Sequence, residues 1–222
     1  PIYLPEACLD KAFQSCLAFS PPSFIVEVGS YDGETLRRHH AASPYSIPIG
    51  FEANPANFFK MCLGKHVQFM AVADYDGTIT IHEPLTKDGA STNGIPNIWS
   101  KSSSVLKLNT PSAYVQYDVP CTKLDTFFEY AIGADKSFVL AIDAEGFGYE
   151  VIKGAIEMLR HTTMIKIEAE SEQLWANQKT SSYIHSILEK DFVLVGVTAK
   201  VEIKENTHLL RAQVLEQHSG YY

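Results

Sequence analysis

Short apolar runs alternate with longer amphipathic segments along most of the chain, and the two patterns predict different elements. Runs rich in β-branched and aromatic residues have the length of buried strands. They cover residues 24–28, 47–53, 67–74, 137–146 and 163–170. Between them, apolar residues recur at helical spacing, which gives each predicted helix one apolar face. The expected helices cover residues 5–19, 35–42, 55–63, 122–132, 149–160 and 181–190.

Other parts of the chain carry different patterns. An Asp-Gly pair at 76–77 lies among alternating residues and predicts a hairpin, and residues 114–120 have the pattern of a further strand. Residues 84–104 are rich in Gly, Pro, Ser, Thr and Asn, and so long a loop in a compact domain is usually functional or disordered. We expect the substrate region there. Residues 192–197 and 207–215 are apolar runs with no helix between them, which predicts an antiparallel pair.

Buried strands that alternate with helices indicate an α/β fold, with a mostly parallel sheet covered on both faces. A length of 222 residues fits one domain, and the chain shows no internal repeat and no linker. We therefore expect a single domain over residues 1–222, with an N-terminal helix within 1–22. Thr122 and Asp125 are expected to cap the helix at 122–132.

Composition narrows the class of protein. Hydrophobic residues make up 45% and charged residues 20% of the chain, as in soluble globular proteins. The formal charge of -8 argues against a nucleic acid as the main partner, and no apolar run approaches the ~20 residues of a membrane span. Four cysteines without a CxxC pair indicate a reducing, cytoplasmic compartment with the thiols in the core. The chain begins at Pro1, which leaves open a trimmed targeting segment.

Acidic and small residues gather where the predicted strands end. In open α/β sheets, ligands bind at the carboxyl ends of the strands. The candidate site residues at these ends are Glu27, Gly29, Ser30, Tyr31, Gly33, Glu52, Ala53, Ala73, Asp74, Asp143, Glu145, Glu168 and Glu170. A phosphate site requires backbone N–H groups and cations, so a ring of acids argues against one.

The loop after the first strand reads ExGxxxG rather than GxGxxG, and Tyr31 replaces the middle glycine that approaches a pyrophosphate. No GxxxxGK[ST] loop is present. S-adenosylmethionine suits an acidic rim better, because it has an ammonium, a sulfonium and a ribose diol but no phosphate. Glu52, which lies 23 residues after Gly29, can accept both ribose hydroxyls. Nicotinamide sites share that acid, so it indicates a ribose without choosing the cofactor.

Each of these features also has a purely structural interpretation. Gly29 and Gly33 can simply make a tight turn. Glu52 can stabilise the start of the next helix through its dipole, and Asp143 and Glu145 can do the same for the helix after them. Their order at successive strand ends is more specific than any one of them.

Several segments, in order, match a known family. They read “VEVGSYDGETL”, “IGFEANPANF”, “AVADYDGTITI”, “SSSVL”, “VPCTKLDTFF”, “LAIDAEGFGYEVIKGA” and “HLLRA”. The chain resembles the FkbM-type S-adenosylmethionine-dependent methyltransferases from about residue 24 to residue 212. The resemblance implies a Rossmann-like class I methyltransferase fold, a three-layer sandwich whose seven-stranded sheet has an antiparallel last strand. It also implies O-methylation of a hydroxyl on a sugar, a glycan or a small natural product.

The resemblance assigns roles to individual residues. Glu27, Gly29 and Gly33 match the cofactor loop, and Glu52 matches the acid that binds the ribose. The other matches are Ala73 and Asp74 near the adenine, and Asp143 and Glu145 beside the transferred methyl group. Two positions depart from the family: Tyr31 stands where Asn is frequent, and Ala141 where Lys is frequent. The second departure puts in doubt any charge relay through that lysine.

The transfer itself suggests further candidates. An acceptor hydroxyl loses a proton during or after attack, so a nearby carboxylate assists. Asp143 is our first candidate for this base and Glu145 the second. The expected acceptor-binding residues are Ser104, Glu168, Glu170 and Trp175, with Trp99, Phe147 and Tyr149 as further walls. We expect no dedicated metal site, although Glu168 and Glu170 with Asp143 could hold a divalent cation.

Two rival classes stay open at this point. A nicotinamide-dependent oxidoreductase shares the strand, the loop and the acid that binds the ribose. The missing middle glycine argues against this class, and so does the absence of a second catalytic domain in 222 residues. A non-catalytic binding module with the same fold is the other. The acceptor and the oligomeric state are also open: a sugar, a lipid-linked glycan, a polyketide and a nucleic-acid ribose all offer a hydroxyl.

Overall fold

A mostly parallel sheet of eight strands forms the centre of the molecule. The structure is a computed structural model that describes residues 2–3, 5–60, 66–84, 103–109, 113–204 and 207–218. The strands, in order across the sheet, are β1 (Ile2–Tyr3), β10 (Phe192–Lys204), β11 (Thr207–His218), β9 (Thr162–Glu170), β8 (Phe138–Ile142), β2 (Phe24–Val28), β3 (Ile47–Glu52) and β4 (Val67–Phe69). Only β11 is antiparallel to its neighbours β10 and β9. The expected parallel sheet with an antiparallel last strand is confirmed, with β1 as an additional edge strand.

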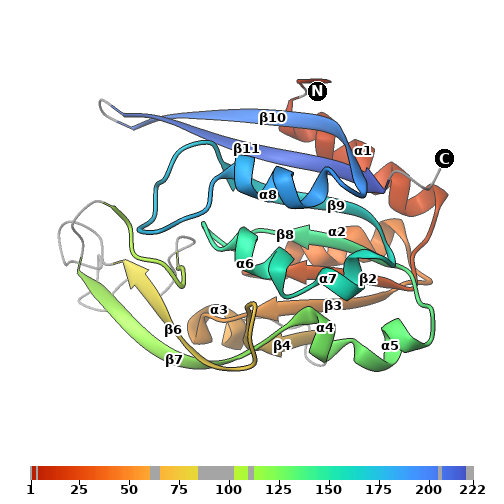
Figure 1. The fold of residues 1–222 in the computed structure, drawn as a ribbon, viewed down its shortest axis with the longest axis horizontal. Coiled ribbons are helices and arrows are strands. Elements are labelled where there is room, and N and C mark those ends of the chain that lie inside the picture. The colour runs from red at the N-terminus through yellow and green to blue at the C-terminus, as the bar shows by residue number, and fades with distance from the viewer. Residues whose placement is uncertain are drawn as a thin grey trace.

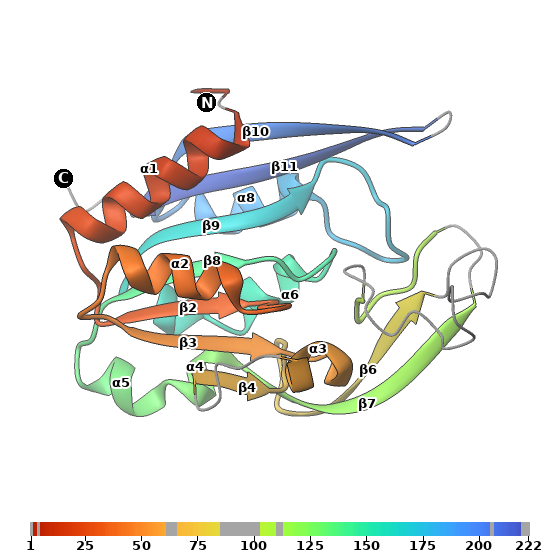
Figure 2. The ribbon, with the colours of Figure 1, turned by 180° about the vertical axis from the view of Figure 1, so that it is seen from behind.

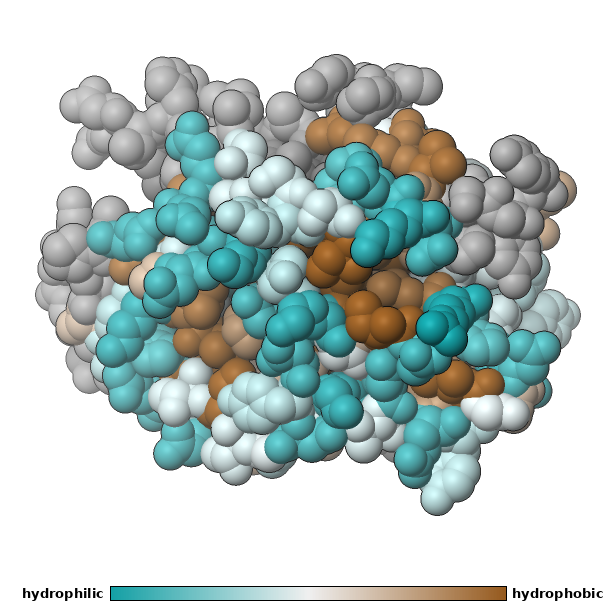
Figure 3. Space-filling view, in the orientation of Figure 1, coloured by the Kyte–Doolittle hydropathy of each residue, from teal (hydrophilic) through white to brown (hydrophobic). Residues whose placement is uncertain are grey.

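Helices cover both faces of this sheet, as Figures 1 and 2 show from opposite sides. α1 (Glu6–Phe19) and α2 (Glu34–Ala42) lie on one face. The other face carries α4 (Leu124–Phe127), α5 (Glu129–Gly133), α6 (Gly148–Lys153), α7 (Ile156–Leu159) and α8 (Ser181–Leu188). Hydrophilic residues predominate on the outer surface of this second face, with smaller hydrophobic areas between them (Figure 3). The layers are those of the three-layer α/β sandwich expected above.

The two faces have separate cores because strand residues alternate in direction. Ile25 of β2 packs with Leu9 on the side of α1 and α2, and its neighbour Val26 packs with Val151 on the other side. Glu27, two residues after Ile25, therefore faces α1 and α2. A charged residue in this position of a buried strand is a first indication of function, because buried charges are costly unless they have partners.

A second, smaller sheet lies beyond the carboxyl ends of β2 and β3 (Figure 2). Its order is β5 (Ala71–Val72), β7 (Tyr114–Thr122) and β6 (Gly77–Pro84). The predicted strand over 67–74 is thus divided: β4 belongs to the large sheet and β5 to the small one. The predicted hairpin at 76–77 is wrong, because β7 lies between β5 and β6 and pairs with both.

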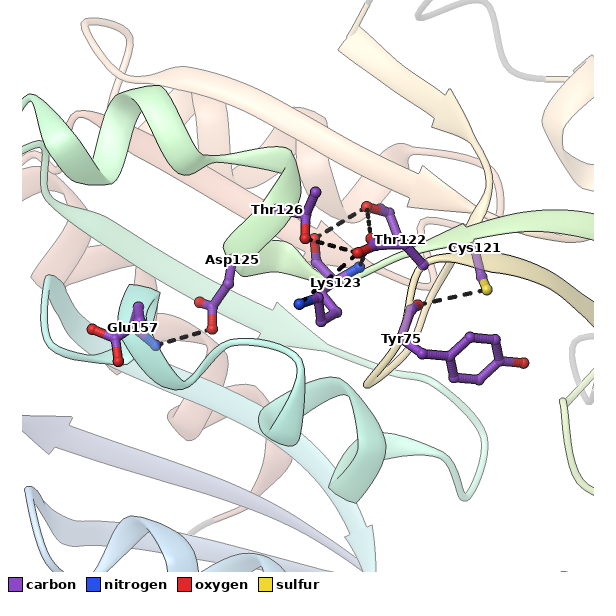
Figure 4. Close-up of polar contacts among 8 residues, drawn as sticks. Tyr75, Cys121, Thr122, Lys123, Asp125, Thr126 and Glu157 are labelled. Atoms are coloured by element: carbon purple, nitrogen blue, oxygen red, sulfur yellow. Dashed lines mark hydrogen bonds and ion pairs between the residues drawn. The ribbon is translucent and has the colours of Figure 1, made fainter.

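Two predicted helices are divided as well. The segment 122–132 contains α4 and α5, and 149–160 contains α6 and α7. The predicted cap is also wrong: Asp125 accepts hydrogen bonds from the backbone N–H groups of Glu157 (3.1 Å) and Met158 (2.9 Å), so it caps α7 (Figure 4). The Thr122 hydroxyl donates to Asp76 Oδ1 (2.9 Å). Both side chains bind partners more than thirty residues away, which local spacing does not reveal.

Some expectations fall partly outside the described residues. α3 (Pro55–Lys60) forms the first part of the helix expected over 55–63, whereas most of 84–104, with Trp99, lies outside. The cysteines at 8 and 16 are exposed and only the one at 121 is buried, so the expected core position is wrong for two of the three described thiols. None of the helices in the described ranges has the length and apolar character needed to cross a membrane.

Candidate active site

A cavity of about 600 Å³ opens at the carboxyl ends of β2, β3, β8 and β9. This is the edge at which open α/β sheets bind ligands, and the volume lies within the range of about 300–1,000 Å³ of small-molecule sites. The predicted site residues that line the cavity are Glu27, Gly29, Ser30, Tyr31, Glu52, Ala53, Ser104, Asp143, Glu145 and Glu168. The structure therefore brings together residues from four strand ends that are far apart in the sequence.

The loop after β2 requires a glycine at its start. Gly29 has a φ of 82°, and a Cβ atom there would lie 1.9 Å from the Asp143 carbonyl oxygen. The N–H groups of Gly29 and Ser30 both donate to the Phe51 carbonyl oxygen (3.0 Å). The loop is thus held closely against the ends of β3 and β8. Any side chain at Gly29 would push the loop away from the end of β8.

Two residues other than glycine adopt a left-handed backbone in the cavity wall. Tyr31 has a φ of 48° and Glu145 a φ of 41°. Such conformations cost free energy and occur frequently at functional sites. Gly33 (φ 71°) also has a left-handed backbone, but it lies outside the cavity lining, where it begins α2.

Glu52 supports the strained loop and faces the cavity at the same time. Its Oε2 accepts a hydrogen bond from the Tyr31 N–H (2.7 Å) and its Oε1 accepts one from the Asn54 N–H (2.7 Å). The Asn57 side chain and the Ala53 backbone interact with the same carboxylate. Burial raises the pKa of Glu52 to about 7, although these backbone donors partly oppose the shift. Two neighbouring hydroxyls, such as a ribose diol, fit these acceptors.

Glu27 lies one strand away and is 3% exposed. Its Oε2 has no hydrogen-bond partner, and its Oε1 lies 3.9 Å from His39 Nδ1 of α2. Burial raises the pKa of Glu27 to about 8, and the nearby Ser30 hydroxyl and Lys166 ammonium partly offset this. Burial also lowers the pKa of His39 to about 4. Near neutral pH, both side chains are therefore largely uncharged.

Ser103, Ser104 and Val105 form a further part of the cavity wall. They belong to segment 103–109, which pairs with segment 173–178 behind it, and we call the two segments together the brace. The backbone of Ser104 exchanges hydrogen bonds with His82 of β6 (2.7 and 3.0 Å). The Ser104 hydroxyl donates to the Glu145 carbonyl oxygen (2.6 Å). Further along, Asn109 N–H donates to Leu174 O (2.9 Å). The brace connects the small sheet to the loop after β9, and sequence patterns did not predict it.

Two predicted acceptor-binding residues support the wall from behind. Trp175 is fully buried, and its indole packs so closely on Gly146 that a Cβ atom there would lie 2.3 Å from the ring. Glu170 Oε2 accepts a hydrogen bond from Gln178 Nε2 (2.6 Å), and Gln178 Oε1 accepts the Leu174 N–H (2.8 Å). Neither Trp175 nor Glu170 lines the cavity.

The predicted adenine segment also lies outside the lining. Ala73 is fully buried, and Asp74 Oδ2 accepts a hydrogen bond from Lys153 Nζ (2.6 Å). Asn54, not among our predicted site residues, does line the cavity. Its Nδ2 donates to Ser103 Oγ (2.8 Å), and its Oδ1 accepts the Ala56 N–H (2.8 Å) at the start of α3. An Asn directly before a proline at a helix start is the sequence signal that could have identified it.

The structure lends no support to a metal site. Within the part of the chain that the structure describes, no three His, Cys, Asp or Glu side chains are arranged to hold a metal ion. The hypothesis of a cation between Asp143, Glu168 and Glu170 therefore has no geometric basis, since Glu170 is bound to Gln178.

The sheet order and the glycine loop at the carboxyl end of β2 define a Rossmann-like α/β protein. A family profile described as “Methyltransferase FkbM domain” matches residues 27–194. The chain therefore belongs to the FkbM family of methyltransferases, as the resemblance in the sequence indicated. No protein of curated function matches the sequence significantly.

Solved structures with similarity to the chain include three methyltransferases. Precorrin-6y C5,15-methyltransferase from Geobacter metallireducens GS-15 is 9% identical, with a TM-score of 0.40 over 97% of this chain and 91% of that chain. Methyltransferase FkbM from Methylobacillus flagellatus KT is 11% identical, with a TM-score of 0.47 over 93% and 50%. An O-methyltransferase from Bacillus cereus, solved in complex with SAH, is 12% identical, with a TM-score of 0.45 over 98% and 84%. Because these sequence identities and TM-scores are low, membership of the family rests on the profile match.

The raised pKa of Glu27 predicts a dependence of stability on pH. In the unfolded chain Glu27 loses its proton near its ordinary value of 4.5, and in the folded protein near 8. The contribution of protonated Glu27 to the free energy of unfolding is fully present below pH 4.5 and is lost as the pH rises through 8. Gln cannot ionise, so the Tm of Glu27→Gln should fall less than the Tm of the wild type between pH 5 and 8.5. The difference should be several °C, because 1 kcal/mol of stability corresponds to about 2–4 °C in Tm for a chain of this size.

Thermal unfolding followed by circular dichroism at a series of pH values measures this difference. Glu157→Gln is the matched control, because Glu157 is exposed and pairs with Arg160 at the surface. The control should keep the wild-type slope. Equal slopes for Glu27→Gln and wild type would show that Glu27 is already ionised in the folded protein.

Proposed function

We propose that the protein is an S-adenosylmethionine-dependent O-methyltransferase that acts on a hydroxyl of a sugar, a glycan or a small natural product. The observation that carries this proposal is the carboxylate of Glu52. It lines the cavity and is held in place by the backbone N–H groups of Tyr31 and Asn54. Membership of the methyltransferase family supports the choice of cofactor over a nicotinamide.

The residues present fit this cofactor at its ribose and at its amino-acid group. Glu52 would receive the two ribose hydroxyls, beside the backbone of Gly29 and Tyr31. Glu27, whose Oε2 is buried in the cavity wall without a hydrogen bond, would receive the ammonium group. When bound, S-adenosylmethionine supplies a methyl group on a positively charged sulfur. A positive centre is stabilised by a cavity wall with several carboxylates.

Asp143 is the proposed base because of its position between the two halves of the cavity. Its backbone carbonyl lies against Gly29 of the cofactor loop, and Glu145, two residues on, is attached to Ser104 of the brace. Asp143 would accept the proton that the acceptor hydroxyl loses, and Glu145 is the alternative. The fixed backbone around both residues would position an acceptor hydroxyl, and alignment of the reacting groups accelerates transfer.

The acceptor side of the cavity has an aromatic face and hydrogen-bonding groups. Phe147, which is 7% exposed, and Ser104 and Glu168 line it. Sugars bind well where an aromatic ring lies beside polar groups. The carboxylates that line the cavity are those of Glu6, Asp10, Glu27, Asp32, Glu34, Glu52, Asp143, Glu145 and Glu168, against the cations Arg38 and Lys166. This excess of acids favours a neutral acceptor over a phosphorylated one or a nucleic acid.

Glu52→Ala tests the cofactor assignment. Hydrogen bonds to a charged group contribute about 1.5–3 kcal/mol each, so the loss of two should weaken S-adenosylmethionine binding by about 100-fold or more. Isothermal titration calorimetry on the wild type, on Glu52→Ala and on the surface control Glu157→Ala measures this effect. Unchanged affinity in Glu52→Ala, or binding of NADH by the wild type in place of S-adenosylmethionine, would overturn the assignment.

Asp143→Asn tests the assignment of the base. The variant keeps the shape of the side chain but not the proton acceptor, so turnover should fall by about 10²- to 10⁴-fold, while cofactor affinity changes by less than about threefold. Transfer of a radiolabelled methyl group to a panel of sugars and hydroxylated natural products provides the readout. Full turnover in Asp143→Asn would move the role to Glu145, and the same assay on Glu145→Gln would then decide.

A further inference from the structure

The cavity extends below the cofactor loop into a chamber formed by Glu27, Ser30, His39, Lys166 and Asp10, which we call the lower chamber. Its geometry follows from strand register. Glu27 of β2 is aligned with Ala141 of β8, and Ala141 is aligned with Lys166 of β9. The side chains of Glu27 and Lys166 therefore lie on the same face of the sheet, two strands or ~10 Å apart. The small side chain of Ala141 leaves the space between them open.

Several groups of the lower chamber are buried without partners. Within the described residues, Glu27 Oε2, Ser30 Oγ and His39 Nδ1 have no partner in hydrogen-bond geometry, although these three residues are only 2–3% exposed. Buried polar groups are nearly always paired in folded proteins, and leaving one unpaired costs free energy. Three such groups in one part of a cavity wall indicate a polar ligand there.

Lys166 supplies the opposite charge on the far side of this chamber. Its side chain is 12% exposed, and its ammonium group is hydrogen-bonded to Asp10 Oδ1 of α1. An ammonium group has three N–H donors, and Asp10 takes one of them. Asp10 thus holds the amine at the chamber wall and leaves donors for an incoming anion.

We propose that Lys166, positioned by Asp10, binds the carboxylate of the cofactor's amino-acid group in the lower chamber. This inference rests on the proposed function, because it assumes that the ligand is S-adenosylmethionine. An amino-acid zwitterion carries an ammonium and a carboxylate group, and the chamber offers a hydrogen-bond acceptor at Glu27 and a cation at Lys166 on opposite sides. The helix α1 becomes part of the binding site, since Asp10 connects it to Lys166.

Arg38 is the other cation that lines the cavity, and it is less suited to this role. It is exposed on α2, and its Nη2 donates to Thr35 Oγ1 (3.1 Å). Solvent screens an exposed charge more strongly than a buried one. The interaction of a carboxylate with Lys166 is therefore the stronger of the two.

Lys166→Met tests the proposal when three ligands are compared. S-adenosylmethionine and S-adenosylhomocysteine carry the amino-acid group, whereas 5′-methylthioadenosine has the same adenosyl thioether without it. Lys166→Met should weaken binding of the first two by about 10- to 100-fold and change binding of the third by less than about twofold. Isothermal titration calorimetry gives all three affinities. Lys123→Met is the matched control, because Lys123 is paired with Asp76 outside the cavity, and it should change none of them.

Each alternative result has a definite meaning. If Lys166→Met weakens all three ligands equally, or none of them, the carboxylate role is wrong. If Arg38→Met produces the selective loss instead, the anchor is Arg38 and the proposal fails. If the wild type binds none of the three, the proposed function itself fails, which is a different outcome.

A second variant covers the case in which Lys166→Met does not fold because Asp10 is left without its partner. The double variant Asp10→Asn/Lys166→Met removes both charges together and should show the same selective loss of the two ligands that carry the amino-acid group. Lys166→Arg keeps the charge and should retain most of the selectivity. A double variant that binds S-adenosylmethionine as tightly as the wild type would overturn the proposal.

Discussion

The buried carboxylate of Glu52 holds together the two loops on which the cavity depends. It accepts the N–H of Tyr31, whose backbone is left-handed, and the N–H of Asn54, whose side chain binds Ser103 of the brace. Without this acceptor, two buried backbone donors would lose their partner, at a cost of about 1–3 kcal/mol each. The same burial raises the pKa of Glu52 to about 7. A ligand that donates two hydroxyl hydrogens stabilises the ionised form, so structural support and ligand binding use one group.

Much of the fold, and the position of the cavity, could be predicted from the sequence, because both depend on local patterns. Buried strands followed by acids placed Glu27, Glu52 and Asp143 at one edge of a parallel sheet, and the structure brings them to one cavity. The failures have a common cause. Asp125 caps a distant helix, and β7 separates β5 from β6. In both cases the partner is set by tertiary packing, which overrides local propensity.

The lower chamber was missed for a related reason. Lys166 lies in the middle of β9 and Asp10 within an amphipathic helix more than 150 residues earlier, so neither belongs to a motif. Only the register of β2, β8 and β9 reveals that Lys166, Ala141 and Glu27 share one row. Conversely, Trp175 has the chemistry of an acceptor wall but is buried behind it. Residue type indicates which groups are available for binding, whereas strand register and packing decide which of them reach the cavity.

The central claim is that one ligand spans the cavity from Glu52 to the lower chamber. A crystal structure of the protein with S-adenosylhomocysteine tests this most directly. We predict both ribose hydroxyls within hydrogen-bond distance of the Glu52 carboxylate, about 2.5–3.0 Å between oxygens, and the ligand carboxylate at Lys166 Nζ. A ribose away from Glu52, or an adenosyl group outside the cavity, would contradict the account.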